Sequence, residues 1–240
     1  MSECWSKADL HIHSNHSDGL ARIPEIMDHV QEMTDLRVIA ITDHNTIEGA
    51  LFAKSLEDMY DFEVIVGEEI SSRSGHVIGL YLEQHVPAGL SLVETITRIR
   101  EQDGIVMIPH PFSNQGVFGP FGRTMFREAA NELAFQALEV YNSIPYLGWA
   151  NRIASKVFAG GNGIAATGGS DAHVLQGIGS GYTLFRGSSA ADLRVSIDRF
   201  ETRAETGPGG LGLTLKYARS IRKIHRQHVW NWDRCEARHL

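Results

Sequence analysis

Nine residues with metal-binding side chains are spread along the chain, and seven of them fall in five short clusters. The clusters are Asp9–His13, Ser17–Gly19, Thr42–His44, Gly67–Glu69 and Gly169–His173. The nine candidate ligands are His11, His13, Asp18, His44, Glu69, His76, His110, Asp171 and His173. Imidazole and carboxylate groups that converge on one place can bind several divalent ions and support hydrolysis. The set therefore predicts a multi-metal hydrolytic site.

Residues spaced two apart are informative members of this set. His11 and His13 lie in a strand-like run, so their side chains face the same side and can reach one ion. By itself, this pair is equally well explained by core or surface histidines. Asp171 and His173 repeat the spacing after two glycines, which allow close backbone approach. Asp18 lies in a Ser-Asp-Gly turn, where an aspartate commonly caps the turn instead.

Other candidates lie at the ends of apolar runs. Asp43 and His44 end a buried strand, where polar groups are costly without partners, so Asp43 is expected to orient His44 or another ligand. Glu68 and Glu69 point in opposite directions along a strand, so one of them is expected to enter the site. His110 stands between two prolines, which stiffen the backbone just past a strand.

The remaining histidines are weaker candidates. His16 lies in the loop before Asp18 and is expected to contact the substrate rather than a metal ion. Surface positions are the favoured interpretation for His29, His85, His225, His228 and His239.

The elements that must position these residues alternate between strands and helices. Apolar, β-branched runs predict strands over 8–13, 37–42, 62–70, 76–82, 104–108, 139–142, 163–167 and 182–185. Helical spacing predicts helices over 23–33, 46–59, 91–102, 127–137, 146–159 and 190–200. This alternation predicts an α/β fold with a parallel sheet, closed or open. Most candidate ligands follow a strand's C-terminal end, where the loops of a barrel converge on one mouth; His76 starts its strand instead.

Length and composition indicate one large α/β domain. The chain has 240 residues, enough for a single barrel with a sizeable core. No apolar run reaches the roughly 18 residues that a membrane span needs. Residues 1–7 lack the apolar region of a secretory signal, and two cysteines near opposite ends do not suggest a disulfide framework. A cytoplasmic location is therefore expected.

Charge is distributed unevenly along the chain. The net charge is -7, from 29 acidic and 22 basic residues. Residues 213–240 contain seven Lys or Arg and two Asp or Glu, a charge of +5, which leaves -12 for the remainder. This acidic body argues against non-specific nucleic-acid binding. Gly207–Gly210 reads as a linker between a domain over 8–206 and a basic segment over 207–240, expected to be helical and either packed on the barrel or attractive to an anionic substrate.

Taken in order, the motifs resemble the PHP (polymerase and histidinol phosphatase) superfamily. They read D-L-H-I-H at 9–13, S-D-G at 17–19, I-T-D-H at 41–44, G-E-E-I-S at 67–71, P-H-P at 109–111 and G-S-D-A-H at 169–173. Each motif is weak alone, but the ordered set is specific and covers about residues 8 to 200. The resemblance implies a distorted (β/α)7 barrel, with a two- or three-metal site at the C-terminal mouth of the strands and phosphoesterase chemistry.

The resemblance also implies roles for individual residues. All nine candidates become ligands of two or three divalent ions (Mn, Zn or Fe), and Glu69 rather than Glu68 matches the family's glutamate. Glu69 is the expected bridging carboxylate, and catalytic roles fall on Glu69, Asp171 and His173. Longer nucleotide-phosphatase members carry a large insertion between the middle and late motifs, for which this chain has no room.

The expected reaction is hydrolysis of a phosphate mono- or diester by metal-activated water. The expected substrate is a phosphorylated small molecule, a nucleotide or an oligonucleotide, with no membrane involved. Residues 114–127 follow His110 and suit a substrate loop in which Arg123 binds phosphate, although a plain packed loop fits equally well. Arg73 is a second, weaker phosphate-binding candidate.

Two other classes of protein remain open. The chain could be a catalytically quiet PHP module that binds a partner, but the full ligand set argues against this. It could instead be an amidohydrolase-type metal enzyme, whose barrel also starts with a His-x-His strand. Such enzymes often carry a bridging lysine, and no lysine occurs between Lys54 and Lys156.

Overall fold

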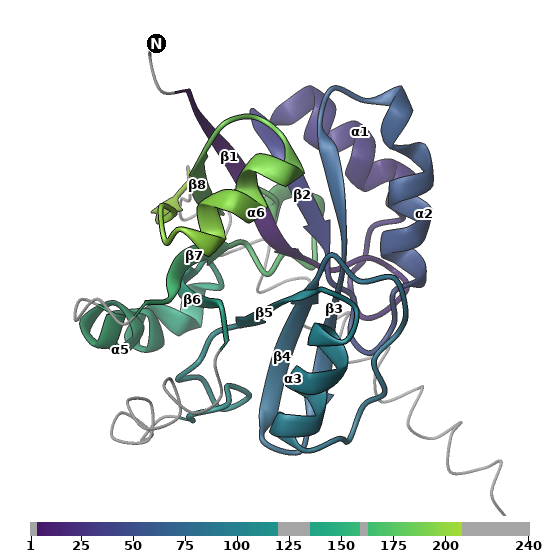
Figure 1. Ribbon diagram of the computed structural model, residues 1–240. Coiled ribbons are helices and arrows are strands. Elements are labelled where there is room, and N and C mark those ends of the chain that lie inside the picture. The colour runs from purple at the N-terminus through teal and green to yellow at the C-terminus, as the bar shows by residue number, and fades with distance from the viewer. Residues whose placement is uncertain (1–3, 120–134, 159–162, 208–240) are drawn as a thin grey trace, which may run out of the picture.

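The computed structural model describes residues 4–119, 135–158 and 163–207, which form one mixed sheet with flanking helices (Figure 1). The strand order is β7-β6-β5-β4-β3-β2-β1-β8-β9. The strands are β1 Trp5–Ile12, β2 Leu36–Ile41, β3 Glu63–Ser72, β4 Gly75–Leu80, β5 Ile105–Ile108, β6 Ala137–Asn142, β7 Ala165–Gly169, β8 Gly181–Arg186 and β9 Arg203–Thr206. The helices are α1 Ile23–Met33, α2 Glu48–Leu56, α3 Leu92–Arg100, α5 Gly148–Phe158 and α6 Ala190–Asp198, with short 3-10 turns η1 Glu57–Met59, η2 Pro145–Leu147 and η3 Leu175–Gly177.

The sheet rolls up until β1 meets the end of β7, which makes a nearly closed barrel. Ile12 and Ala172 form an isolated parallel bridge, and the His13 amide donates to the Ala172 carbonyl over 2.9 Å. The Gly168 amide donates to the Thr183 hydroxyl over 3.0 Å, which ties β7 to β8. The predicted α/β barrel is therefore confirmed, although the described sheet has nine strands rather than seven.

The direction of several strands corrects the prediction of a parallel sheet. Strand β4 is antiparallel to both β3 and β5, β8 is antiparallel to β1, and β9 is antiparallel to β8. The turn between β3 and β4 contains just Arg73 and Ser74, whereas a parallel pair needs a crossover of a dozen or more residues. Strand β9 was not predicted, because its residues are mostly exposed and show no apolar alternation.

The lower half of the barrel interior is filled by apolar side chains and closed by α6. Residues near the N-terminal ends of the parallel strands, such as Ala8, Val38 and Ile65, form one buried cluster. Leu193 and Ile197 of α6 belong to the same cluster and have no exposed surface. Helix α6 therefore seals the bottom of the barrel and leaves the opposite mouth free for polar chemistry.

A β-bulge in β1 changes which side chains face the interior. Asp9 pairs with Ile39 and Ile12 pairs with Ile41, so three residue steps in β1 lie opposite two steps in β2. Ala8 consequently packs inside the barrel, whereas Ile12 packs outside under α1 and α2. A bulge of this kind re-aims side chains. It turns the odd-numbered His11 and His13 toward the interior.

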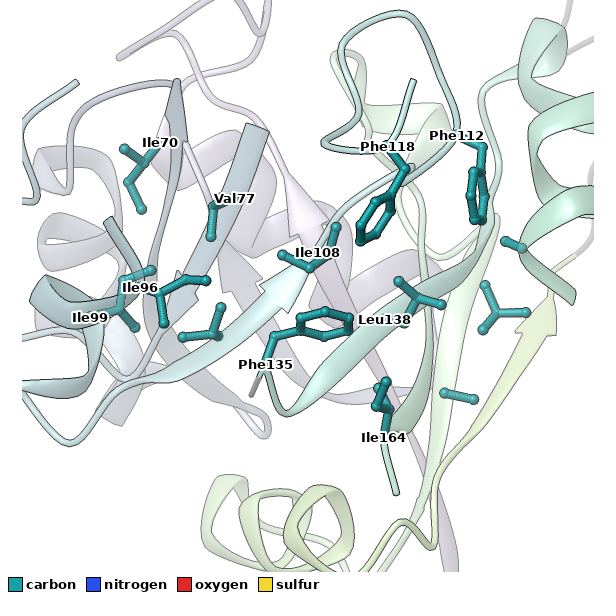
Figure 2. Close-up of a cluster of buried hydrophobic side chains, with 14 of the residues drawn as sticks. Ile70, Val77, Ile96, Ile99, Ile108, Phe112, Phe118, Phe135, Leu138 and Ile164 are labelled. Atoms are coloured by element: carbon teal, nitrogen blue, oxygen red, sulfur yellow. The ribbon is translucent and has the colours of Figure 1, made fainter. Parts of the chain in front are cut away.

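The outer face of the second half of the barrel carries a second core. Figure 2 shows Phe112, Phe118 and Phe135 near Ile108 and Leu138. The ring centroid of Phe118 lies 5.8 Å from that of Phe112 and 6.4 Å from that of Phe135. These side chains hold the segment that follows His110 against the barrel. Helices α3 and α5 cover the same cluster, and α1 and α2 cover the first half.

Local sequence signals explain how the helices start. Pro24 lies in the first turn of α1, and Glu25 accepts the Arg22 amide over 2.7 Å. Ser91 and Glu94 form a capping box at the start of α3, as Ser189 and Asp192 do for α6.

Most predicted elements are found within a few residues of their predicted bounds. Part of the helix predicted over 127–137, and all of the predicted basic C-terminal helix, lie outside the described residues. Ala137, the last residue of that predicted helix, begins β6 instead. Within the described part of the chain, no helix is long and apolar enough to cross a membrane.

Candidate metal centre

All nine predicted ligands come together at the mouth of the barrel. They form four overlapping groups in which the potential ligand atoms lie within 4.8 Å of one another. The groups are His13, Asp18, His44 and His173; His11, Glu69 and His110; His11, His13 and Asp171; and His44, Glu69 and His76. The overlap places one composite site, rather than separate sites, above the apolar interior.

Glu69 lies at the centre of this arrangement and is buried. Its Oε1 lies 2.9 Å from His76 Nδ1 and 3.0 Å from His110 Nε2. Its Oε2 lies 3.2 Å from the Nε2 atoms of both His11 and His13 and 3.3 Å from His44 Nδ1. One carboxylate therefore faces five imidazoles, which is the position that a bridging carboxylate between cations would occupy.

His13 gives an independent indication that the site fits metal ions. Both of its ring nitrogens are buried and, among the described residues, have no hydrogen-bond partner of good geometry. Its Nε2 lies 3.2 Å from both Glu69 Oε2 and Asp171 Oδ1. Buried polar atoms without partners are rare because they cost free energy. Buried imidazole nitrogens beside two carboxylates are a donor set that suits a divalent metal ion.

Asp18 centres the group on the outer side of the site. Its Oδ2 lies 3.1 Å from His173 Nε2 and 3.9 Å from His44 Nε2, and its Oδ1 lies 3.7 Å from His13 Nδ1. The turn-capping interpretation of Asp18 is therefore not needed to explain its position.

Glu139 and Asn142 contact three of the candidate ligands and were not predicted from the sequence. Buried Glu139 lies 2.9 Å from His11 Nδ1 and accepts the His110 amide over 2.7 Å. Asn142 donates from Nδ2 to Glu139 over 2.9 Å and to Asp171 over 3.0 Å. A signal existed, because a carboxylate and an amide within the apolar strand β6 are costly unless they have partners.

Asp43 supports candidate ligands other than His44, which is the second of the two roles predicted for it. Its carboxylate accepts the Ser14 amide over 2.7 Å, the Ser14 hydroxyl over 2.6 Å and the Ser17 hydroxyl over 2.6 Å. It therefore fixes the loop between His13 and Asp18 rather than orienting the His44 ring.

Glu68 points away from the site, as expected because successive side chains on a strand point in opposite directions and Glu69 points into it. Its Oε1 lies 2.7 Å from Nδ1 of half-exposed His85, and its Oε2 accepts the Val86 amide over 2.9 Å. His85 therefore keeps the surface position predicted for it but also partners a buried carboxylate.

Two of the candidate ligands have strained backbones. His110 has φ +27° and Asp171 has φ +51°, in the left-handed region that favours glycine. Such conformations persist where the surrounding structure holds them, and they cluster at functional sites. The Glu139 bond to the His110 amide and the Asn142 bond to Asp171 hold both residues here.

Charges in the site shift the pKa values of its members. Burial alone would lower the pKa of His13, but the carboxylates of Asp171 and Glu69 overcome it and raise the pKa to about 10. Burial would raise the pKa of Asp18, yet the imidazoles of His173, His13 and His44 lower it. Burial lowers the pKa of His44 to about 4. The site thus keeps Asp18 charged and His44 neutral, whereas His13 holds a proton that a bound cation would have to displace.

The three predicted substrate-binding residues have different positions. His16 is partly exposed in the loop before Asp18, and its Nδ1 lies 4.0 Å from Glu48. Arg73 lies in the β3–β4 turn, where its exposed guanidinium donates to Glu94 over 3.3 Å. Arg123 lies outside the described residues.

Comparison with known families identifies the chain. A model of the PHP domain matches residues 9–142, and a model described as PHP-associated matches residues 148–201. The chain therefore belongs to the PHP domain family, as the motifs predicted.

Three curated relatives are similar to this chain. Two are uncharacterised proteins of Methanocaldococcus jannaschii: one is 38% identical over 159 residues (62% of this chain and 88% of that protein), the other 32% identical over 181 residues (75% and 70%). A 5'-3' exoribonuclease of Haemophilus influenzae is 32% identical over 103 residues, which are 41% of this chain and 37% of that enzyme.

Solved structures with low sequence identity share the fold. A two-domain protein of Bacteroides vulgatus, described as containing a predicted PHP-like metal-dependent phosphoesterase, has a TM-score of 0.68 at 19% identity, covering 93% of this chain and 70% of that one. A lesion-specific endonuclease of Pyrococcus furiosus has a TM-score of 0.59 at 13% identity, covering 84% of this chain and 58% of that one.

Proposed function

We propose that the protein is a metal-dependent phosphoesterase that hydrolyses a phosphate mono- or diester. The observation that carries the proposal is the position of Glu69, whose two oxygens face five imidazoles in a buried site that also contains Asp171. Family membership supports the same chemistry, as do a relative named as an exoribonuclease and a structural neighbour named as an endonuclease.

The ligand set suits two or three divalent ions, with Mn, Zn and Fe as the candidates. The proposed ligands are His11, His13, Asp18, His44, Glu69, His76, His110, Asp171 and His173. Bound ions would lower the pKa of water toward 7 and neutralise charge on the phosphoryl oxygens.

The protein's own residues prepare this site. Glu139 accepts from His11 and so directs the Nε2 atom of that ring toward Glu69. Asn142 leaves Oδ1 of Asp171 facing His13 by donating to Oδ2. We assign catalytic roles to Glu69, Asp171 and His173, because each belongs to a group of side chains that could hold an ion.

The substrate is proposed to be a phosphorylated small molecule, a nucleotide or an oligonucleotide. A substrate panel with bis(p-nitrophenyl) phosphate, p-nitrophenyl phosphate and an amide series tests the reaction class. Turnover of a phosphate ester that chelator abolishes and added metal restores is the expected result. Amide turnover without ester turnover would favour the amidohydrolase alternative, and no turnover would favour a binding module.

Metal content gives a second test that does not depend on activity. Elemental analysis of protein purified without chelator, after metal supplementation, should find at least two ions per chain. Less than one ion per chain would contradict the proposed site.

A further inference from the structure

An exposed stripe of two aromatic and two basic side chains begins beside the metal centre. Tyr146 in η2 and Trp149, Arg152 and Lys156 in α5 are spaced by three, three and four residues, which places the helical members on one face. Tyr146 is 63% exposed and Trp149 is 43% exposed, although both are large enough to be valuable in a core. The opposite face of α5 packs into the outer core through Ala150, Ile153 and Ala154.

Hydrogen bonds connect the start of this stripe directly to the site. Asn151 accepts the Asn142 amide over 3.1 Å and donates to the Asn142 carbonyl over 2.8 Å. Asn142 in turn donates to Asp171 over 3.0 Å. Asn142 therefore links the first turn of α5 by hydrogen bonds to Asp171, a proposed metal ligand.

Tyr146 is also within electrostatic range of the site. Partial burial raises the pKa of its hydroxyl, and the carboxylates of Asp171 and Asp18 raise it further. Because β6 and β7 are parallel, α5 must run from the mouth of the barrel back along its outer side. Figure 1 shows α5 beside β6, on the other side of the barrel from α1 and α2. The ten helical steps from Tyr146 to Lys156 span about 15 Å in this direction.

The charge of this segment differs from that of the rest of the protein. No Asp or Glu occurs between Glu139 and Asp171, although the whole chain carries -7. In the described part of the chain, neither Arg152 nor Lys156 forms an ion pair. Several other surface cations pair with carboxylates, namely Lys7, Arg22, Lys54, Arg73, Arg98 and Arg194, whereas Arg37, Arg199 and Arg203 do not within the described residues. The stripe is thus an unpaired basic surface on an acidic protein.

We infer that this stripe binds a single-stranded oligonucleotide whose terminal phosphodiester enters the metal centre. Aromatic side chains stack on bases, and unpaired cations bind the backbone phosphates that follow, which is how single strands are bound without sequence preference. Tyr146 and Trp149 stack on bases nearest the mouth, and Arg152 and Lys156 bind phosphates farther along α5. The inference rests on the proposed phosphoesterase function and names its substrate class.

The test compares a small and a long substrate in the metal-loaded protein. The double variant Arg152→Glu/Lys156→Glu should raise the KM for a thymidine octanucleotide by tenfold or more and leave kcat/KM for bis(p-nitrophenyl) phosphate unchanged. A fluorescein-labelled phosphorothioate octamer, which resists hydrolysis, reports binding by anisotropy. Its log Kd against log salt slope should fall by about 1.4, since each phosphate contact on a single strand contributes about 0.7.

Matched variants separate stacking and charge from folding. Trp149→Ala should weaken octamer binding roughly 5- to 100-fold, from about 1–3 kcal/mol of stacking per base, and Trp149→Phe should retain most of it. Arg199→Glu reverses one charge just after α6, at the sealed end of the barrel, and is matched to the single variant Arg152→Glu. Arg199→Glu should leave octamer binding unchanged, whereas Arg152→Glu should weaken it.

The outcomes distinguish the two proposals. If the wild-type protein does not hydrolyse bis(p-nitrophenyl) phosphate, the proposed function fails whatever the stripe binds. If it does so while the double variant keeps wild-type octamer KM and salt slope, the stripe is an ordinary solvated face and the inference is overturned. Equal loss of octamer binding in Arg199→Glu and in Arg152→Glu would also overturn it, because the effect would then come from net charge.

Discussion

The two ends of the barrel interior are built from the same strands, but one end buries apolar side chains and the other buries polar ones. At the bottom, residues such as Ala8, Val38 and Leu193 are apolar and fully buried. At the mouth, His13 and Glu69 are equally buried but polar, and the His13 ring lacks hydrogen-bond partners within the described structure. Groups that are costly to bury are retained where they can serve a function. The bottom should therefore govern stability and the mouth should govern chemistry.

The largest expected effect is the loss of activity at the mouth. Asp171→Ala and His11→Ala should each reduce phosphoesterase turnover to the level of chelator-treated protein, because each removes a proposed ligand rather than a core side chain. Steady-state kinetics measure the loss, and far-UV circular dichroism should show a largely intact fold. Asp198→Ala, at the end of α6, serves as the control and should keep wild-type turnover. Wild-type rates in either ligand variant would refute the mechanism.

The next effect is the loss of stability at the bottom. Leu193→Ala removes a fully buried side chain that closes the barrel, and should lower the free energy of unfolding by about 2–5 kcal/mol. Chemical denaturation measures this change, and turnover per folded molecule should stay near wild type. Val195→Ala in the same helix changes a side chain that is 47% exposed, and should cost no more than about 0.5 kcal/mol. Equal destabilisation by both variants would show that α6 does not plug the barrel as described.

The sequence predicted where the strands lie better than it predicted their directions. Apolar runs predicted nearly every strand, because a strand buried on both faces needs them whatever its direction. Direction was wrong for β4, since it depends on a two-residue turn that the periodicity does not contain. That reversal explains His76: the start of an antiparallel strand lies at the same mouth as the ends of its parallel neighbours.

The candidate ligands were recognisable from the sequence because the order of their motifs is specific, whereas the residues that support them were not. Glu139 belongs to none of those motifs, and its value depends on the tertiary contacts that it makes with His11 and His110. The bulge that turns His11 inward is likewise a property of the register between β1 and β2. Alternation alone would have placed His11 and Ala8 on opposite faces.

A moderate effect should follow from changing a supporting residue. Glu139→Gln removes the charge that faces His11 Nδ1, and should weaken metal affinity by about 10–100-fold. Turnover should recover when the metal concentration is raised, which a folding defect would not allow. Glu68→Gln is the matched control, because this carboxylate in β3 is also buried but contacts His85 instead of a candidate ligand. If both variants lose affinity equally, Glu139 has no specific role at the metal centre.

The smallest effect concerns pH. The pKa of His13 is raised to about 10, above the ordinary value of 6.5. A raised pKa in the folded state stabilises the metal-free protein fully below pH 6.5, and this contribution is lost as pH rises toward 10. A bound cation must displace that proton, so metal affinity should instead increase with pH over the same window. Each displaced proton changes the binding free energy by at most about 1.4 kcal/mol per pH unit.

The stability of the metal-free protein and the stabilisation by bound metal should therefore change with pH in opposite directions. Between pH 6.5 and 9, the Tm of chelator-treated protein should fall slightly as pH rises, whereas the metal-dependent increase in Tm should grow. Calorimetric titration with metal in buffers of different ionisation enthalpy should detect released protons. His13→Gln should reduce that proton release, because it removes the titrating ring from between Glu69 and Asp171. A metal affinity that is independent of pH in this window would mean that the imidazoles at the mouth are already deprotonated, and that the carboxylates beside them do not control their charge.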